Sequence, residues 1–303
     1  MNVLPSKKRK RLSRRDVLRL SIGLGAAGPL ATALASERSR SRMKFGLVTY
    51  QWGRDWDLPT LIANCEKAKV LGVELRTTHA HGVEPNLNAQ QRSEVKKRFK
   101  DSPVVLVGLG SNERFDDPDP AKLKKAIEAT KAFVKLSHDV GGSGVKVKPD
   151  SFHEGVPHEK TIEQIGKSLN MLAAFSAEYG QQIRLEVHGD FARLPVMKKV
   201  LEVTDHPNVA ICWNCNPQDL DGKGLEYNFN LVKERFGATA HVREMNVGTY
   251  PYQALMTLFV KMGYKGWVLL EAHSELKGGV EAIVEQHDLW KRMIAKAQED
   301  SRN

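Results

Sequence analysis

Apolar residues from position 43 onward form short runs that alternate with longer amphipathic stretches. The runs are rich in Val, Ile and Leu and have the length of buried strands. They lie at residues 44–50, 72–77, 104–109, 144–149, 183–188, 208–214, 240–246 and 266–272. The chain between successive runs is long enough for a helical crossover, so the strands are expected to be parallel.

The stretches between these strands carry the signals of helices. Four of them end on or near a glycine, the residue most common just past a helix C-terminus. They are residues 58–72, 119–142, 158–180 and 251–266. Eight strand–helix units in about 255 residues predict an α/β fold, the (β/α)8 TIM barrel. A doubly wound open sheet is the alternative, and the lack of GxGxxG after the first strand disfavours it.

A barrel predicts where the functional residues lie. Its active site is at the C-terminal ends of the strands, and side chains alternate between the interior and the helix layer. In the fifth strand Leu185 and Val187 share one face, and Glu186 and His188 share the other. Polar side chains also share a face at Glu74 and Arg76, Lys146 and Lys148, His241 and Arg243, and Glu271 and His273. Buried charge is costly unless it is paired or bound to metal, so these positions predict a polar pocket.

Four of these strand ends offer metal ligands. Glu186, Asn214, His241 and Glu271 end the last four strands. Their two carboxylates, imidazole and amide oxygen suit Mn²⁺, Mg²⁺ or Co²⁺, and the imidazole also admits Zn²⁺ or Fe²⁺. The alternative is a hydrogen-bonded polar network that binds no metal.

The same residues resemble those of the xylose isomerase-like TIM barrels, a family of sugar phosphate isomerases and epimerases. The resemblance covers residues 43–297, and the family has Glu, Asp, His and Glu at the ends of strands five to eight. Glu186 in LEVHG, His241 in AHVRE and Glu271 in GYKGWVLLEA match three of these positions. Asn214 in CWNCNPQD stands where the family has Asp, which weakens the ligand set unless His188 or Asp219 contributes.

The resemblance implies a metal-dependent sugar isomerase or epimerase. In such enzymes the metal binds hydroxyl and carbonyl oxygens, and a pair of glutamates removes and returns the proton beside the carbonyl. Glu186 and Glu271 match that pair, and His188 faces the same pocket as an acid, a substrate contact or a rim residue. The same chemistry serves a lyase or dehydratase acting on a keto-sugar or 3-keto-glycoside. The expected partner is therefore a small sugar, and assembly into a homo-oligomer is left open.

Further polar and aromatic residues near the strand ends are candidates for substrate contact. The loop after the second strand supplies Arg76, His79 and His81, although solvation suits these histidines equally. One of the inward lysines, Lys146 or Lys148, is expected to pair with an acid such as Glu74. Arg243 in the strand-seven motif is another candidate contact. Tyr50 and Trp52, at the end of the first strand, are candidates for packing against a sugar ring, and packing in the core is the alternative.

Charge along the 303 residues is uneven. The chain has a formal charge of +10, but residues 1–35 hold eight Lys and Arg against Asp16, which leaves +3 for residues 36–303. This distribution argues against nucleic-acid binding, including the DNA-repair endonucleases that share the barrel. A carbohydrate-binding barrel without catalysis is the other rival, and Asn214 is the residue that keeps it open.

The basic start of the chain predicts an export signal. Residues 13–19, SRRDVLR, resemble the twin-arginine motif, and residues 33–35, ALA, form a cleavage site. We expect a signal peptide at 1–35, a linker at 36–42, the barrel at 43–297 and a tail at 298–303. The mature protein would be periplasmic and would meet a membrane only through the export machinery. Cys212 and Cys215 are expected to be structural thiols or one disulfide.

Overall fold

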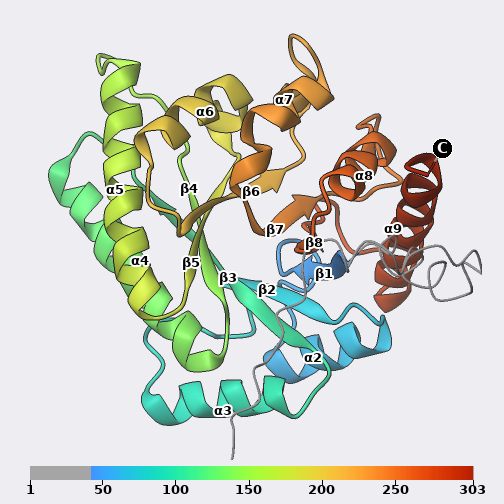
Figure 1. Cartoon of the computed structure of the whole chain (residues 1–303). Coiled ribbons are helices and arrows are strands. Elements are labelled where there is room, and N and C mark those ends of the chain that lie inside the picture. The colour runs from blue at the N-terminus through green and yellow to red at the C-terminus, as the bar shows by residue number, and fades with distance from the viewer. Residues whose placement is uncertain (1–41, 303) are drawn as a thin grey trace, which may run out of the picture. The chain divides into compact units, whose positions relative to one another are not determined.

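The computed structural model describes residues 42–302. Within them eight parallel strands close into a barrel in chain order, and the helices surround it (Figure 1). The strands are β1 (Lys44–Val48), β2 (Gly72–Arg76), β3 (Val105–Arg114), β4 (Gly144–Lys148), β5 (Gln182–Glu186), β6 (Val209–Asn214), β7 (Phe236–Val242) and β8 (Trp267–Leu270). The predicted (β/α)8 fold is confirmed.

The α-helices occupy the crossovers and follow the last strand. They are α2 (Leu58–Lys67), α3 (Ala89–Lys100), α4 (Pro120–Val140), α5 (His158–Glu178), α6 (Leu194–Val203), α7 (Leu225–Val232), α8 (Tyr252–Lys261) and α9 (Val280–Asp300). Short 3-10 turns lie at η2 (Gly189–Ala192), η3 (Pro217–Leu220) and η4 (Lys233–Arg235). Helix α9 thus includes residues 298–300, which the sequence assigned to a tail.

The main apolar core lies between the strands and the helices. Inside the barrel, a small apolar cluster of Val48, Val107 and Leu269 lies among buried polar and charged side chains. Glycines make room there for large side chains. A Cβ at Gly72 would lie 2.2 Å from the Trp267 ring, and one at Gly108 would lie 2.6 Å from Arg184 Nη1. Arg184 is fully buried and donates to the carbonyl of Val107 over 3.1 Å. This filled lower layer is the base on which the residues at the barrel mouth rest.

Strand register brings the predicted ligands together. Asn214 of β6 is paired with His241 of β7, and Glu186 of β5 is paired with Cys212 of β6. His241 is paired in turn with Leu269 of β8, so Asn214 and Glu271 each lie one inward position beyond the partner of the preceding ligand. The stagger of strands in a closed barrel brings these successive inward positions to one mouth.

Other expectations have different outcomes. Cys65, Cys212 and Cys215 are buried free thiols, so the disulfide alternative is not formed. The predicted export signal lies outside the described residues. Among residues 42–302, no helix is both long and apolar enough to cross a membrane.

Candidate active site

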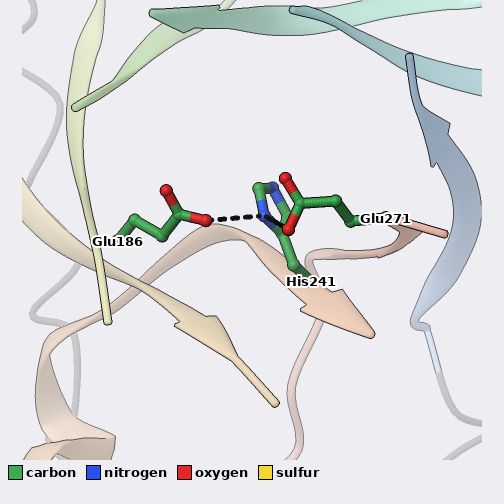
Figure 2. Close-up of side chains that lie close together, drawn as sticks. All are labelled: Glu186, His241 and Glu271. Atoms are coloured by element: carbon green, nitrogen blue, oxygen red, sulfur yellow. Dashed lines mark ion pairs between the residues drawn. The ribbon is translucent and has the colours of Figure 1, made fainter. Parts of the chain in front are cut away.

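Two carboxylates face one imidazole at the C-terminal mouth of the barrel. Glu186 ends β5, His241 lies in β7, and Glu271 directly follows β8. Figure 2 shows both carboxylates turned towards the ring of His241, with Nδ1 lying 3.6 Å from Glu186 Oε1 and 3.6 Å from Glu271 Oε2. All three side chains are buried, and one ligand atom from each lies within 4.8 Å of the others. That spacing allows the three groups to share one cation.

Asn214 completes this group from β6. Its Nδ2 donates to Glu186 Oε1 over 3.2 Å, which turns its Oδ1 away from that carboxylate. Oδ1 is buried and has no hydrogen-bond partner in residues 42–302, and neither ring nitrogen of His241 has one of good geometry. Buried polar atoms are normally satisfied, so these orphaned atoms indicate a ligand for the site.

Lys146 and Glu74 are two further buried charged residues in contact with this group. Lys146 Nζ is 2.8 Å from Glu186 Oε2. Glu74 Oε1 is 3.3 Å from His241 Nε2, and both Glu74 oxygens lack a hydrogen bond within the described part of the chain. The buried carboxylates of Glu74, Glu186 and Glu271 lie among the buried cations Lys146, Lys148 and Arg184. The unpaired ligand atoms beside two carboxylates fit a divalent cation, which Glu186, Asn214, His241 and Glu271 would hold.

Electrostatics keep the two glutamates ionised. Burial alone would raise the pKa of Glu186, but the Lys146 ammonium and His241 outweigh it and lower that pKa to about 2. Burial also opposes ionisation of Glu271, yet His241 holds its pKa well below the usual range. Burial would lower the pKa of His241, but neighbouring Cys212, followed by the carboxylates of Glu74 and Glu271, raises it well above its usual value. The site therefore presents carboxylates to a cation or a substrate.

One wall of the site is a continuous chain of hydrogen bonds from β3 to β5. Arg114 Nε lies 2.8 Å from Asp150 Oδ2, and His188 Nδ1 lies 2.6 Å from Asp150 Oδ1. The other ring nitrogen of His188 is 3.4 Å from Lys148 Nζ. Burial, followed by repulsion from Lys146, lowers the pKa of Lys148. The hydrogen bond from His188 is the main cause that lowers the pKa of Asp150.

Backbone geometry fixes Asp150 in this chain. Asp150 has φ +75°, a left-handed conformation that is uncommon outside glycine. Its carbonyl accepts from the N–H of Asp190 over 2.8 Å. A Cβ at Gly189 would lie 2.0 Å from the same carbonyl oxygen, so only glycine fits there. The loops after β4 and β5 are thereby joined beneath His188.

The walls enclose a pocket of about 290 Å³ above the carboxylates. Tyr50 and Arg76 lie on one side, with the guanidinium carbon 4.8 Å from the ring centre, and Arg76 Nη2 donates to Asn112 Oδ1 over 2.8 Å. His273 stands edge-on to Tyr50 at 5.1 Å between ring centres. Charged, amide and aromatic groups at one mouth suit a small polar ligand that carries many hydroxyls.

The structure brings most of the predicted site residues to this pocket. Those that line it are Tyr50, Arg76, Lys148, Glu186, His188, Asn214, Arg243 and Glu271. His241 and Lys146 lie buried beside and beneath the carboxylates. Lys146 pairs with Glu186 rather than with Glu74, because its long side chain reaches up one layer from its position beside Arg184.

Three predicted substrate contacts lie elsewhere. Trp52 packs into the main apolar core, because the chain turns away from the barrel mouth after β1 and Gly53 has φ +83°. His81 is buried and bonds its own loop, at 2.8 Å from the Arg76 carbonyl and 3.0 Å from the Val83 N–H. His79 does not line the pocket, and its ring lies 6.3 Å from that of His81 between centres. Burial, followed by the charge of Arg76, lowers the pKa of His79 to about 4.

Three residues of the site, Arg114, Asp150 and Asn216, were not predicted from the sequence. Asp150 and Arg114 form the His188 wall, and Asn216 lines the pocket while its amide donates to the Val187 carbonyl over 2.7 Å. The available signal was position, since Asp150 follows β4 by two residues and Asn216 follows β6 by two.

Comparison with known families identifies the class of this barrel. The profile of the family described as xylose isomerase-like TIM barrel matches residues 62–295. The chain belongs to this family, as its fold and strand-end residues led us to expect. No curated protein sequence matches the chain.

Solved structures of sugar epimerases have the same fold. An L-ribulose 3-epimerase superposes with a TM-score of 0.74 at 13% identity, covering 86% of this chain and 97% of that one. The 3-keto-D-glucoside 4-epimerase YcjR from E. coli has a TM-score of 0.70 at 15% identity, with coverage of 82% and 99%. A D-psicose 3-epimerase with D-tagatose, from Clostridium cellulolyticum H10, has a TM-score of 0.66 at 17% identity, with coverage of 86% and 98%.

Proposed function

We propose that this chain is a divalent-metal-dependent sugar isomerase or epimerase that moves a proton beside a carbonyl of a sugar or keto-sugar. The observation that carries the proposal is the buried pair Glu186 and Glu271, facing each other across His241 beside the orphaned oxygen of Asn214. The sugar epimerases named among the similar structures support a sugar as the substrate class.

The bound cation would supply Lewis acidity at the substrate oxygens, making the adjacent C–H more acidic. Glu271 is the better base, because Glu186 is held by Lys146 at 2.8 Å and by Asn214 at 3.2 Å. Glu271 has looser contacts, with His241 at 3.6 Å and His273 at 3.9 Å. Glu271 would take the proton, and Glu186 would complete the pair from the other side of His241.

A lyase or dehydratase acting on the same site is the second candidate, and the His188 wall favours it. Asp150 holds Nδ1 of His188, so the other ring nitrogen shares a proton with Lys148 at the pocket. In this reaction Glu271 takes the proton beside the carbonyl and a carbon–carbon double bond forms. The bond to the leaving oxygen on the next carbon breaks, and that oxygen takes the proton from His188.

The metal content of the purified protein tests the first part of the proposal. We expect about one divalent ion per chain in protein purified without chelator, and loss of that ion in His241→Gln. His287→Gln is the matched control, because His287 is half-buried on α9 against Phe45. Absence of bound metal after Mn²⁺, Co²⁺, Mg²⁺ and Zn²⁺ have each been offered contradicts the metal dependence.

Proton exchange tests the reaction itself. In D₂O the enzyme should introduce deuterium beside the carbonyl of a ketose such as D-fructose, or of a 3-keto-glucoside, as read by NMR. Release of the aglycone from a 3-keto-glucoside would assign the lyase. Neither exchange nor release on any keto-sugar tested would leave a carbohydrate-binding barrel as the better interpretation.

A further inference from the structure

A second cavity opens beside the pocket described above. Its volume is about 500 Å³, and it is formed by the segment after β7 together with the start of η3. Pro217, Arg243 and His273 line both cavities, so the two are neighbours across a shared edge. The first cavity falls just below the roughly 300–1,000 Å³ found for ligand sites, and the volume of the two cavities together lies well within that range.

The two cavities differ in chemistry. The first one is lined by charged and amide groups around Glu186 and Glu271. The second one has Val247, Tyr250 and Tyr252 in its wall, and the two tyrosine rings are 4.8 Å apart between centres. Val247 is 63% exposed, which is unusual for a large apolar side chain. The second cavity thus suits a ring with an apolar face, while the first one suits hydroxyl groups.

The wall of the second cavity is preformed. Tyr250 OH donates to Asp219 Oδ2 over 2.5 Å, and the backbone N–H of Asn216 donates to the same oxygen over 3.0 Å. Asp219 is completely buried, and burial raises its pKa to about 7. These bonds join the segment after β6 to the segment after β7, so the tyrosine ring is held in place before any ligand binds. Asp219 therefore serves this wall, and it does not line the first cavity.

The shared edge offers a polar group for a bridging atom. Arg243 lines both cavities, and its guanidinium group has only N–H donors and no acceptor. An acceptor atom of a ligand at the edge between the cavities is therefore the partner that this side chain suits. The oxygen that joins two rings of a glycoside is such an acceptor.

We propose that the second cavity is an aglycone subsite. It binds an apolar-faced, preferably aromatic ring that is joined through a glycosidic oxygen to the sugar in the first cavity. This inference rests on the proposed function and makes it more specific. The natural substrate is then a keto-glycoside rather than a free monosaccharide, which would fill only the first cavity.

Binding of glycosides that cannot react tests the subsite without depending on turnover. The probes are methyl and p-nitrophenyl D-glucopyranosides, both anomers of each, titrated by calorimetry into the full chain. We expect one anomer of the p-nitrophenyl glucoside to bind about tenfold tighter than its methyl counterpart, equivalent to about 1.4 kcal/mol. p-Nitrophenol alone, lacking the sugar, should not compete for the site.

A matched pair of surface variants locates the effect. Val247→Asn should bring the affinity for the p-nitrophenyl glucoside close to that for the methyl glucoside. Val105→Asn is the control, because Val105 is 50% exposed at the start of β3, at the opposite end of the barrel. Both positions are exposed, so neither substitution should prevent folding.

The outcomes separate this inference from the proposed function. Equal affinity for methyl and p-nitrophenyl glucosides, or equal losses in both variants, overturns the subsite and leaves the sugar site standing. If neither glucoside binds and D-fructose shows no deuterium exchange, the sugar site and the subsite are both wrong. Tight p-nitrophenyl binding that is lost only in Val247→Asn supports the subsite even where no turnover is seen.

Discussion

The two sides of the pocket differ in whether their buried polar atoms have hydrogen-bond partners. On the wall from β3 to β5, Arg114, Asp150, His188 and Lys148 form an unbroken chain of contacts between 2.6 and 3.4 Å. The floor of the pocket consists of Glu74, Glu186, Asn214, His241 and Glu271. There, Glu74, Asn214 and His241 have buried polar atoms without a hydrogen-bond partner among the described residues. The same pocket thus combines a completed network with an incomplete one.

The difference shows which side is built for something else to bind. A satisfied network fixes the position and the proton of its members, so the wall is already in its working form. Asn214 Oδ1 has neither a hydrogen bond nor an ion pair within the described residues, and a buried acceptor of this kind costs roughly 1–3 kcal/mol while it stays unpaired. The fold retains that cost at the height where Glu186 and Glu271 converge. The floor is therefore the part that we expect to respond most to ligand, and the wall the part that we expect to respond most to pH.

The largest expected effect comes from the floor. Glu271→Gln should lower deuterium exchange and aglycone release together by about 10²- to 10⁴-fold, because both reactions begin with proton removal. His188→Gln in the wall should reduce aglycone release and leave exchange nearly unchanged. Rates of the two reactions on one 3-keto-glucoside, followed by NMR, separate these effects.

Glu275→Gln is the control for the loss of a carboxylate, since Glu275 is exposed four residues beyond Glu271. It should keep both rates. Equal losses of exchange in Glu271→Gln and His188→Gln would mean that the floor and the wall act as one unit, and the comparison would fail.

Removing the lysine beneath the floor should have the next largest effect. Lys146→Met leaves Glu186 as a buried carboxylate without its partner at 2.8 Å. Breaking a buried ion pair from one side typically costs about 3–5 kcal/mol, so the metal-free protein should lose about that much stability to urea. Added Mn²⁺ should restore part of the loss, because a cation at Glu186 replaces the missing charge.

Lys148→Met is the companion variant in the wall. Lys148 has only a 3.4 Å contact with His188, so its loss should cost far less stability and should not depend on metal. Similar losses of stability for the two lysine variants, with no restoration by Mn²⁺, would show that the charge of Lys146 is not needed to balance Glu186.

The barrel could be predicted from the sequence because each strand is an apolar run between turn signals. Apolar runs do not mark the ends of strands where side chains are small or polar. Strand β7 begins at Phe236, four residues before its predicted start, since Gly237 and Ala238 give little apolar signal. Strand β3 continues to Arg114 through Ser, Asn and Glu, which read as a loop.

The alternation of side chains along the strands also predicted which residues of the floor face inward, since Glu186 and His241 are strand residues and Glu271 directly follows β8. This alternation no longer predicts the direction of a side chain once the chain leaves the strand. Tyr50 and Trp52 are two residues apart after β1, yet Tyr50 lines the pocket and Trp52 enters the core. Asp150 was missed for the same reason, because a left-handed residue in a loop reverses the direction of its side chain in a way that no periodicity encodes.

A charge added to the floor sharpens the comparison further. Asn214→Asp should tighten metal binding by about tenfold, since affinity for hard cations follows the charge of the ligands. Without metal the new carboxylate would face Glu186 Oε1, now 3.2 Å from the amide, and the protein should be less stable. Thermal unfolding with and without Mn²⁺ should therefore show a larger metal-dependent shift than in the wild type.

Asn216→Asp is the control for this change. The Asn216 amide donates to the carbonyls of Val187 and Asn214, so Asp should cost stability there and leave metal affinity unchanged. If Asn214→Asp and Asn216→Asp shift metal affinity equally, Asn214 is not a ligand.

The smallest effect is expected in the wall and depends on pH. The hydrogen bond from His188, helped by Arg114, lowers the pKa of Asp150 below its usual 3.8. A carboxylate whose pKa is lowered by folding stabilises the protein above its unfolded pKa and loses that contribution as pH falls through the folded value. Asp150→Asn should cost about 1 kcal/mol at pH 7, allowing for solvent screening around the half-exposed Arg114. Urea unfolding of both proteins should show that the difference in stability is constant from pH 7 to pH 5. The difference should shrink below about pH 4, where the wild-type carboxylate becomes protonated.

A difference in stability that stays constant down to pH 2.5 would mean that Asp150 acts through its left-handed backbone rather than through its charge. The wall would then stabilise the protein by packing and not by holding a proton.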